Sequence, residues 1–215
     1  MKKILFLVLT IMLIGLAACG DSKEEDKEAK ASSQVDENKE DKQEPEEMTV
    51  EENDSKDAKV GDTVKSKAGE MKMVSRNDDV GTFKTGPIKM KIKKVNGVSG
   101  KLAGKTAEML DKKEIEYIQV DMEVENTSEE NVTFYASQAV MTTNTREQLE
   151  PDMLLSDHID GEYIGSVKKS GTSFYILENS KAEDVESVRL IYSAPTNSDY
   201  EDIGKEIDIE VELKN

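Results

Sequence analysis

Three segments of this sequence alternate apolar and polar residues at every second position, and this period constrains the fold more than any other feature. The segments are YIQVDMEVE at 117–125, PIKMKIKKV at 87–95 and EIDIEVELK at 206–214. Successive side chains on a β-strand point to opposite faces, so each segment has one apolar face and one wet face. Strands of this kind are typical of antiparallel sheets, because parallel sheets are usually covered on both faces. The sequence therefore predicts an all-β fold.

Shorter segments rich in β-branched and aromatic residues add further strands. They are bounded by turn-forming stretches such as NTSEEN at 126–131 and KKSG at 168–171. These strands are expected at 71–75, 132–136, 138–143, 162–167, 172–177 and 187–192. The one helix-like stretch, 105–114, is short and follows a glycine-rich stretch, 97–104, that we expect to form a loop. Many strands with almost no helix favour an antiparallel β-sandwich.

The alternation also predicts which side chains lie inside. Val120 is expected at the centre of the core, since a slip of one residue would bury Asp121 instead. Lys89, Lys91 and Lys93 share the opposite face of their strand, where we expect Asp or Glu side chains on a neighbouring strand to face them. Three tyrosines are interpreted as core residues rather than as an interaction patch: Tyr163, Tyr175 and Tyr192.

The first residues have the pattern of a secretory signal peptide, which we place at 1–18. Lys2 and Lys3 precede an apolar run at 4–14 that is too short to span a bilayer comfortably. The signal cleavage motif that follows resembles the lipobox of bacterial lipoproteins and consists of Leu16, Ala17 and Ala18 before Cys19. This resemblance implies cleavage before Cys19 and diacylation of its thiol, for example with palmitate. Two acyl chains are about what stable membrane anchoring needs.

Residues 19–65 are expected to form a disordered acidic linker behind the lipidated Cys19. Between residues 21 and 59 there are sixteen Asp and Glu, seven Lys and no aromatic residue, so little apolar surface is available to offset chain entropy. Transient helix is plausible there, but a stable packed helix is not. The expected location is the extracytoplasmic face of the cell membrane, with the folded domain at 66–215 held away from the lipid surface.

The folded part resembles a known family in its succession of strands and turns. The matching features are the alternating strand at 117–125, the polar turn at 126–131, Val132 and Phe134 at the start of the next strand, a return at Gly171, and a final alternating strand. This pattern is similar to the immunoglobulin-like domain of uncharacterised Gram-positive lipoproteins, a domain of unknown function in the superfamily of the immunoprotective extracellular antigen. The resemblance implies an immunoglobulin-like sandwich over about 86–213. It supplies no catalytic residues.

Candidate chemistry is sparse. The single histidine lies in an acidic stretch at 151–163 that could bind a divalent cation, although an EF-hand spacing and a second histidine are absent. The candidate metal ligands are Asp157, His158, Asp160 and Glu162. No nucleophile, nucleotide or dinucleotide motif is present, so we expect no enzymatic activity and no cofactor. The net charge outside the acidic linker remains negative, which argues against nucleic acid as a partner.

Two functions remain open from the sequence. The first is a membrane-anchored binding or accessory module that acts through a protein or envelope partner, with the membrane itself contacted through the lipid on Cys19. The second is a lipoprotein that binds a small ligand or a divalent metal, although a single sandwich offers no two-lobed cleft.

Overall fold

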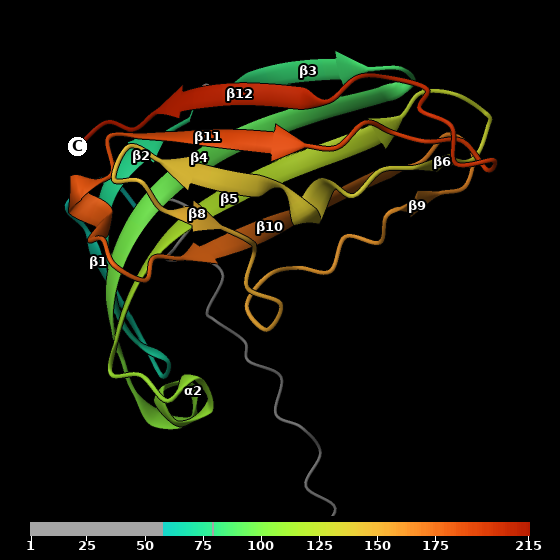
Figure 1. Ribbon diagram of the computed structural model, residues 1–215. Helices are drawn as coiled ribbons and strands as arrows, with labels where there is room; N and C mark the ends of the chain where they lie inside the picture. Colours follow the sequence, from blue (N-terminus) through green and yellow to red (C-terminus); the bar gives the residue numbers. More distant parts are fainter. Residues whose placement is uncertain (1–57, 79) are drawn as a thin grey trace, which may run out of the picture. The chain divides into compact units, whose positions relative to one another are not determined.

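The computed structural model describes residues 58–78 and 80–215, so the predicted signal peptide, the lipobox and most of the predicted linker lie outside the described residues. The described part forms a six-stranded and a four-stranded antiparallel sheet and a two-stranded ladder, β6–β9 (Figure 1). In chain order the elements are β1 (Thr63–Ser66), β2 (Gly69–Asn77), β3 (Gly81–Thr85), β4 (Ile88–Leu102), α2 (Gly104–Leu110), β5 (Glu114–Asn126), β6 (Val132–Thr133), the 3₁₀ turn η1 (Ala136–Gln138), β7 (Val140–Thr143), β8 (Gln148–Leu149), β9 (Glu162–Tyr163), β10 (Lys168–Ile176), the 3₁₀ turn η2 (Ala182–Asp184), β11 (Ser187–Tyr192) and β12 (Ile207–Glu212).

The two larger sheets give the all-β, sandwich-like fold that the alternation predicts. The six-stranded sheet has the order β1-β2-β4-β5-β10, with β3 also paired to β4, and the four-stranded sheet has the order β12-β11-β7-β8. Side chains of both sheets meet in one apolar core. No helix in the described part of the chain is long and apolar enough to cross a membrane.

The centre of the core lies where the sequence places it. Val120 on β5 is fully buried, and so are its neighbours on the same face, Ile118 and Met122. The prediction for the three tyrosines is also confirmed, because Tyr163, Tyr175 and Tyr192 are almost completely inaccessible to solvent. The hydroxyl of Tyr175 donates a hydrogen bond to the backbone oxygen of Ala139, which ties β10 to the chain leading into β7.

The lysine-rich strand pairs with carboxylates as predicted. On the face turned away from the four-stranded sheet, hereafter the outer face, Lys89 lies opposite Glu125 and Lys91 opposite Glu123. A β-bulge after Ile92 shifts the register, so the next residue opposite a carboxylate is Lys94, which faces Asp121. Lys93 lies at the bulge and still reaches Glu123, with 3.5 Å between its Nζ and a carboxylate oxygen. Such exposed pairs contribute little individually, about 0.2–1 kcal/mol each.

The predicted loop at 97–104 is wrong, because β4 continues through these glycines to Leu102. The glycines serve close packing here rather than a turn. A Cβ atom on Gly97 would lie 2.3 Å from the Ser75 hydroxyl oxygen, and one on Gly100 would lie 2.3 Å from the Met71 sulfur. The predicted helix is present but shorter than 105–114, since α2 ends at Leu110 and Asp111 follows in the left-handed conformation.

The folded unit also begins before the predicted boundary at residue 66. Strand β1 starts at Thr63 and pairs with β2 over its whole length. Ala58 is only 7% exposed, and the backbone groups of Gly61 and Asp62 bond to those of Met73. Strand β1 cannot be recognised from the sequence, because it is short and mostly polar and has no apolar alternation. It is stabilised by pairing with β2.

Candidate functional site

The four candidate metal ligands lie in or beside the long loop between β8 and β9, and all four are exposed. Nowhere in residues 58–78 and 80–215 do three or more His, Cys, Asp or Glu side chains come close enough to hold a metal ion. The structure therefore does not assemble Asp157, His158, Asp160 and Glu162 into a metal centre.

Asp157 has a structural task instead, which is to close the edge of β10. Its Oδ2 accepts a hydrogen bond from the backbone nitrogen of Thr172 at 2.8 Å, and its own nitrogen donates to the Thr172 oxygen at 2.9 Å. Two residues further along β10, Phe174 donates its backbone N–H to Ser156 Oγ and accepts from the backbone N–H of Asp152. An uncovered strand edge invites pairing with other chains. The loop covers this edge with its own polar groups.

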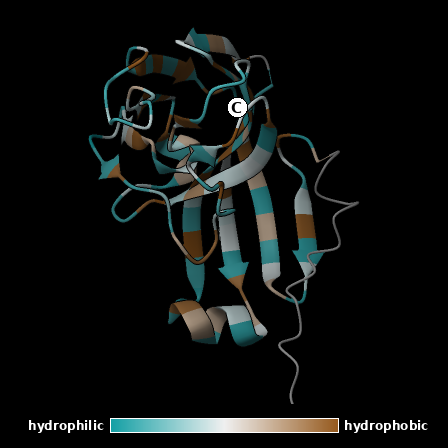
Figure 2. Cartoon of the chain, turned by 90° about the vertical axis from the view of Figure 1, so that its right-hand side faces the viewer, coloured by the Kyte–Doolittle hydropathy of each residue, from teal (hydrophilic) through white to brown (hydrophobic). Residues whose placement is uncertain are grey.

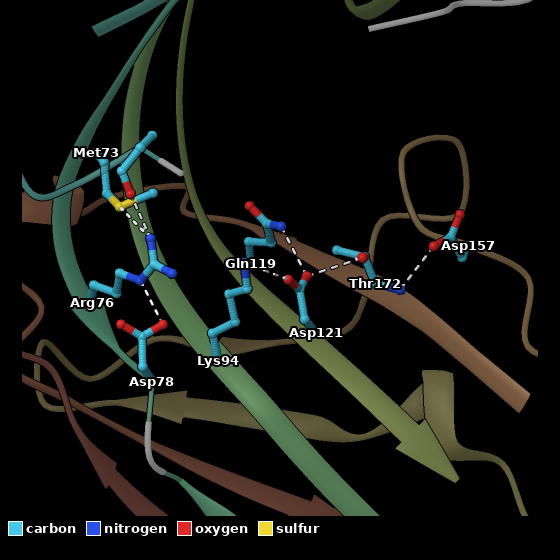
Figure 3. Close-up of polar contacts among 9 residues, drawn as sticks. Met73, Arg76, Asp78, Lys94, Gln119, Asp121, Asp157 and Thr172 are labelled. Atoms are coloured by element: carbon cyan, nitrogen blue, oxygen red, sulfur yellow. Dashed lines mark hydrogen bonds and ion pairs between the residues drawn. The ribbon is translucent and has the colours of Figure 1, made fainter. Parts of the chain in front are cut away.

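The same loop is connected to the outer face of the six-stranded sheet (Figure 3). The hydroxyl of Thr172 donates to Asp121 Oδ1 at 3.0 Å, and Gln119 Nε2 donates to the same oxygen at 2.9 Å. The other oxygen of Asp121 lies 3.8 Å from Lys94 Nζ. A row of polar contacts thus runs from the loop through β10 and β5 to β4, and it holds the loop in a fixed position relative to the sheet.

The far end of the loop is fixed by Lys169 on β10. Its Nζ donates to the backbone oxygens of Asp160 at 2.8 Å and Glu162 at 2.7 Å, and it lies 4.7 Å from the ring centroid of Tyr163. Burial, together with the charge of Asp160, raises the pKa of Tyr163 to about 12. Asp160 and Glu162 are therefore engaged through their backbone with a lysine, which is an unfavourable neighbour for a bound cation.

Between Asp152 and Ser156, which both bond to the backbone of Phe174, the loop presents apolar side chains to solvent. Asp152 Oδ1 accepts hydrogen bonds from the backbone nitrogens of Leu154 and Leu155, at 2.9 and 3.0 Å. This tight turn leaves Met153 73% exposed and Leu154 66% exposed. Neither residue is among the candidates predicted from the sequence, although the apolar run at 153–155 inside an acidic stretch is a signal for them. Large exposed apolar side chains on other connections of the described chain include Tyr135, Ile164 and Tyr200.

This arrangement suits contact with a macromolecule. Burying one large apolar side chain contributes about 1.5–3 kcal/mol, and a loop that is already ordered loses little conformational entropy on binding. Binding residues are often carried by loops on a rigid scaffold. The loop at 152–157, with Met153 and Leu154 at its tip, is hereafter called the presenting loop.

Comparison with known proteins shows similarity to a lipoprotein. No family model matches the chain. The SPbeta prophage-derived uncharacterized lipoprotein YonS of Bacillus subtilis strain 168 is 36% identical over 159 residues, which are 73% of this chain and 73% of YonS.

Two solved structures show lower similarity. A functionally unknown protein from Listeria monocytogenes is 10% identical, with a TM-score of 0.49 over 68% of this chain and 89% of that one. The yjhA protein from Bacillus subtilis is 19% identical, with a TM-score of 0.41 over 61% of this chain and 94% of that one.

Proposed function

The chain belongs to the family of the Bacillus subtilis lipoprotein YonS, and on this premise we propose that it is a lipid-anchored binding module of the cell envelope. In this proposal the β-sandwich is held on the extracytoplasmic face of the membrane and docks a protein partner. No catalytic step is assigned to it. The two facing antiparallel sheets support an immunoglobulin-like module, in which loops between strands make the contacts.

The observation that carries the binding role is the presenting loop. Its tip exposes Met153 and Leu154, while its ends are fixed by hydrogen bonds to Thr172 and Phe174 on β10. Neighbouring exposed apolar side chains that are held in place by an ordered loop support this role, because apolar surface of this kind is often part of an interaction site. The metal-binding form of the alternative function is less well supported, because no three His, Cys, Asp or Glu side chains of residues 58–78 and 80–215 are grouped to hold an ion.

The binding role is tested by cross-linking on living cells, comparing the wild type with the double variant Met153→Ser, Leu154→Ser. We expect cross-linked partners of the wild type to be lost from the double variant. Met109→Ser is the matched control, because Met109 on α2 is also exposed but lies outside the presenting loop. If the double variant captures the same partners as the wild type and the control, the presenting loop is not the binding surface.

The membrane anchor is tested separately with Cys19→Ser. The family and the sequence Leu16-Ala17-Ala18-Cys19 support diacylation of the thiol. A serine hydroxyl is not the acyl acceptor of this reaction, so the variant should incorporate no labelled palmitate and should keep its signal peptide. Acyl labelling of Cys19→Ser at the wild-type level, with the same mature size, would contradict the lipid anchor.

A further inference from the structure

The turn between β3 and β4 lies against the chain that leads into β12. The hydroxyl of Thr85 donates to the backbone oxygen of Lys205 at 2.5 Å and accepts from the backbone nitrogen of Lys205 at 2.7 Å. Figure 1 shows the end of β3 beside the start of β12, and Figure 2 views the molecule from this side, with α2 at the far end of the long strands. An open groove of about 500 Å³ lies between the two segments. We call it the lysine groove, lined by residues 84–86 and 202–205.

Two glycines allow the walls of the lysine groove to approach each other. Gly86 turns the chain with a φ of +52°, and a Cβ atom on Gly204 would lie only 2.9 Å from the Gly86 nitrogen. Within residues 58–78 and 80–215, the backbone N–H groups of Gly86 and Gly204 donate no hydrogen bond. Backbone N–H groups left unpaired in a turn are typical donors to a bound anion.

Each wall of the groove also carries a lysine. Lys84 comes from β3 and Lys205 from the segment before β12, and both side chains are exposed. Neither ammonium group forms an ion pair with another described residue, whereas Lys89 on the neighbouring strand reaches a carboxylate oxygen of Glu125 at 3.9 Å. The positive charges of Lys84 and Lys205 are therefore not neutralised by a carboxylate of the described chain, and they remain available to a ligand.

The groups in the groove favour one class of ligand. Two ammonium groups and two backbone N–H groups match a phosphate monoester, which carries up to two negative charges and three strong acceptor oxygens. Asp202 also lines the groove, and an ionised carboxylate only accepts hydrogen bonds. It would repel the phosphate and accept from a hydroxyl group elsewhere in the ligand. The volume is in the range of small-ligand sites, about 300–1,000 Å³.

We propose that the lysine groove binds a phosphate monoester that carries hydroxyl groups, such as a polyol phosphate. Lys84, Lys205 and the two glycine N–H groups hold the phosphate, and Asp202 accepts a hydrogen bond from a hydroxyl of the ester. This site is separate from the presenting loop, because none of residues 152–157 lines the groove.

The proposal is tested on the ¹⁵N-labelled full chain in detergent micelles, titrated with glycerol 1-phosphate and with inorganic phosphate at constant ionic strength. We expect the amide signals of Gly86 and Gly204 to shift in a saturable way. Glycerol 1-phosphate should reach half-saturation at a lower concentration than inorganic phosphate, because only the ester offers hydroxyls to Asp202.

Three variants test which side chains are responsible. Lys84→Ala combined with Lys205→Ala should raise the half-saturation concentration of glycerol 1-phosphate by about tenfold or more, since two charged donors are lost. Lys72→Ala removes an exposed lysine outside the groove and is the matched control, which should bind as the wild type does. Asp202→Ala should bring the half-saturation concentrations of the ester and of inorganic phosphate closer together.

Three results would each overturn the proposal. The first is the absence of a saturable shift at Gly86 and Gly204 with glycerol 1-phosphate. The second is equal half-saturation for the wild type and the double lysine variant, which would mean that the lysine groove is not the site. The third is inorganic phosphate binding as tightly as the ester, which would exclude the contact of Asp202 with a hydroxyl. Cross-linking through the presenting loop is independent of all three results.

Discussion

At the scale of single residues, Val120 shows how strictly the alternation fixes the sheet. It lies opposite Val95 on β4 and Ser173 on β10, and all three are buried. Val120→Asp puts an unpaired carboxylate into the core and should lower the free energy of unfolding by at least about 3 kcal/mol. The measurement is urea denaturation of the purified protein.

Asp121, next to Val120, is not a neutral comparison, because its carboxylate bonds to Thr172 and Gln119. Ile164→Asp is the better control, since Ile164 is 66% exposed, and it should change stability little. Equal urea midpoints for the two aspartate variants would contradict the assigned register of β5.

Glu147 is a buried carboxylate whose charge stabilises the fold at neutral pH. It is 8% exposed, and its Oε2 accepts hydrogen bonds from the backbone nitrogens of Glu178 and Asn179 at 2.8 and 3.1 Å. Burial alone would raise its pKa, but hydrogen bonds from Ser180 and from these backbone groups outweigh burial and lower the pKa below the ordinary 4.5. The carboxylate therefore stabilises the fold above pH 4.5, and this stabilisation is lost as the pH falls through the lower folded-state pKa.

Glu147→Gln should accordingly reduce the free energy of unfolding by about 1–3 kcal/mol at pH 7. The difference from the wild type should shrink toward zero as the pH falls below 4.5, the ordinary pKa of a glutamate side chain. Urea midpoints between pH 3 and pH 7 give the measurement, with the exposed Glu150→Gln as control. A difference that stays constant over this range would mean that the charge of Glu147 is not the stabilising feature.

At the scale of elements, the strands that sequence predicts well are those with one face in the core. Strands β5 and β12 can be recognised from their period because their alternating apolar residues are buried or partly buried against the core between the sheets. Strand β4 cannot be recognised from the sequence beyond Val95. Its inward face becomes polar at Ser99 and Lys101, while its outward face becomes apolar at Val98. The alternation continues along β4, but the apolar residues move from the inward face to the outward face. The glycine-rich sequence of this segment is also typical of a loop.

The candidate site shows the same difference between composition and geometry. Sequence identifies Asp157, His158, Asp160 and Glu162 as polar groups close together in the chain, but it does not show which backbone groups they meet. The partners of the presenting loop lie on β10, fifteen or more residues further along the chain. Long-range contacts of this kind follow from strand pairing, and no local pattern in the sequence encodes them.

The presenting loop and β10 act as one unit, which Asp157→Ala tests. Without the carboxylate, the Thr172 amide loses its acceptor, and a hydrogen bond to a charged group contributes about 1.5–3 kcal/mol. Hydrogen exchange at Thr172 should therefore accelerate by about tenfold or more, while exchange at Leu190 in the other sheet stays unchanged. Unaltered exchange at Thr172 would show that the loop does not protect this edge.

Divalent cations provide a second test of the same loop. Because its carboxylates bond to backbone groups and Lys169 lies beside Asp160, calcium, zinc and manganese should leave the melting temperature of the wild type unchanged. A rise in the wild type that disappears in Asp157→Ala would instead establish the metal site that the sequence suggests.

At the scale of the whole molecule, the start of the folded unit decides how much chain is needed for stability. A fragment of residues 66–215 lacks most of β1 and the contacts of Ala58 and Gly61 with Arg76 and Met73. It should be less stable than a fragment of residues 58–215, by about 2 kcal/mol or more, from lost hydrogen bonds and apolar burial. Urea denaturation of the two fragments gives the answer. Equal midpoints would place the boundary at residue 66, as the sequence first indicates.

Arg76 has a further consequence for the engineering of this domain. Its side chain binds the oxygen of Ala58, where the chain enters, and its backbone pairs with Lys214, just past β12. Both ends of the described domain therefore contact the same residue, and nearby ends are the geometry that permits domain insertion and circular permutation. Residues 58–214 could be inserted into an exposed loop of a host protein without moving the two ends of that loop apart. The presenting loop would remain accessible to a binding partner in such a fusion.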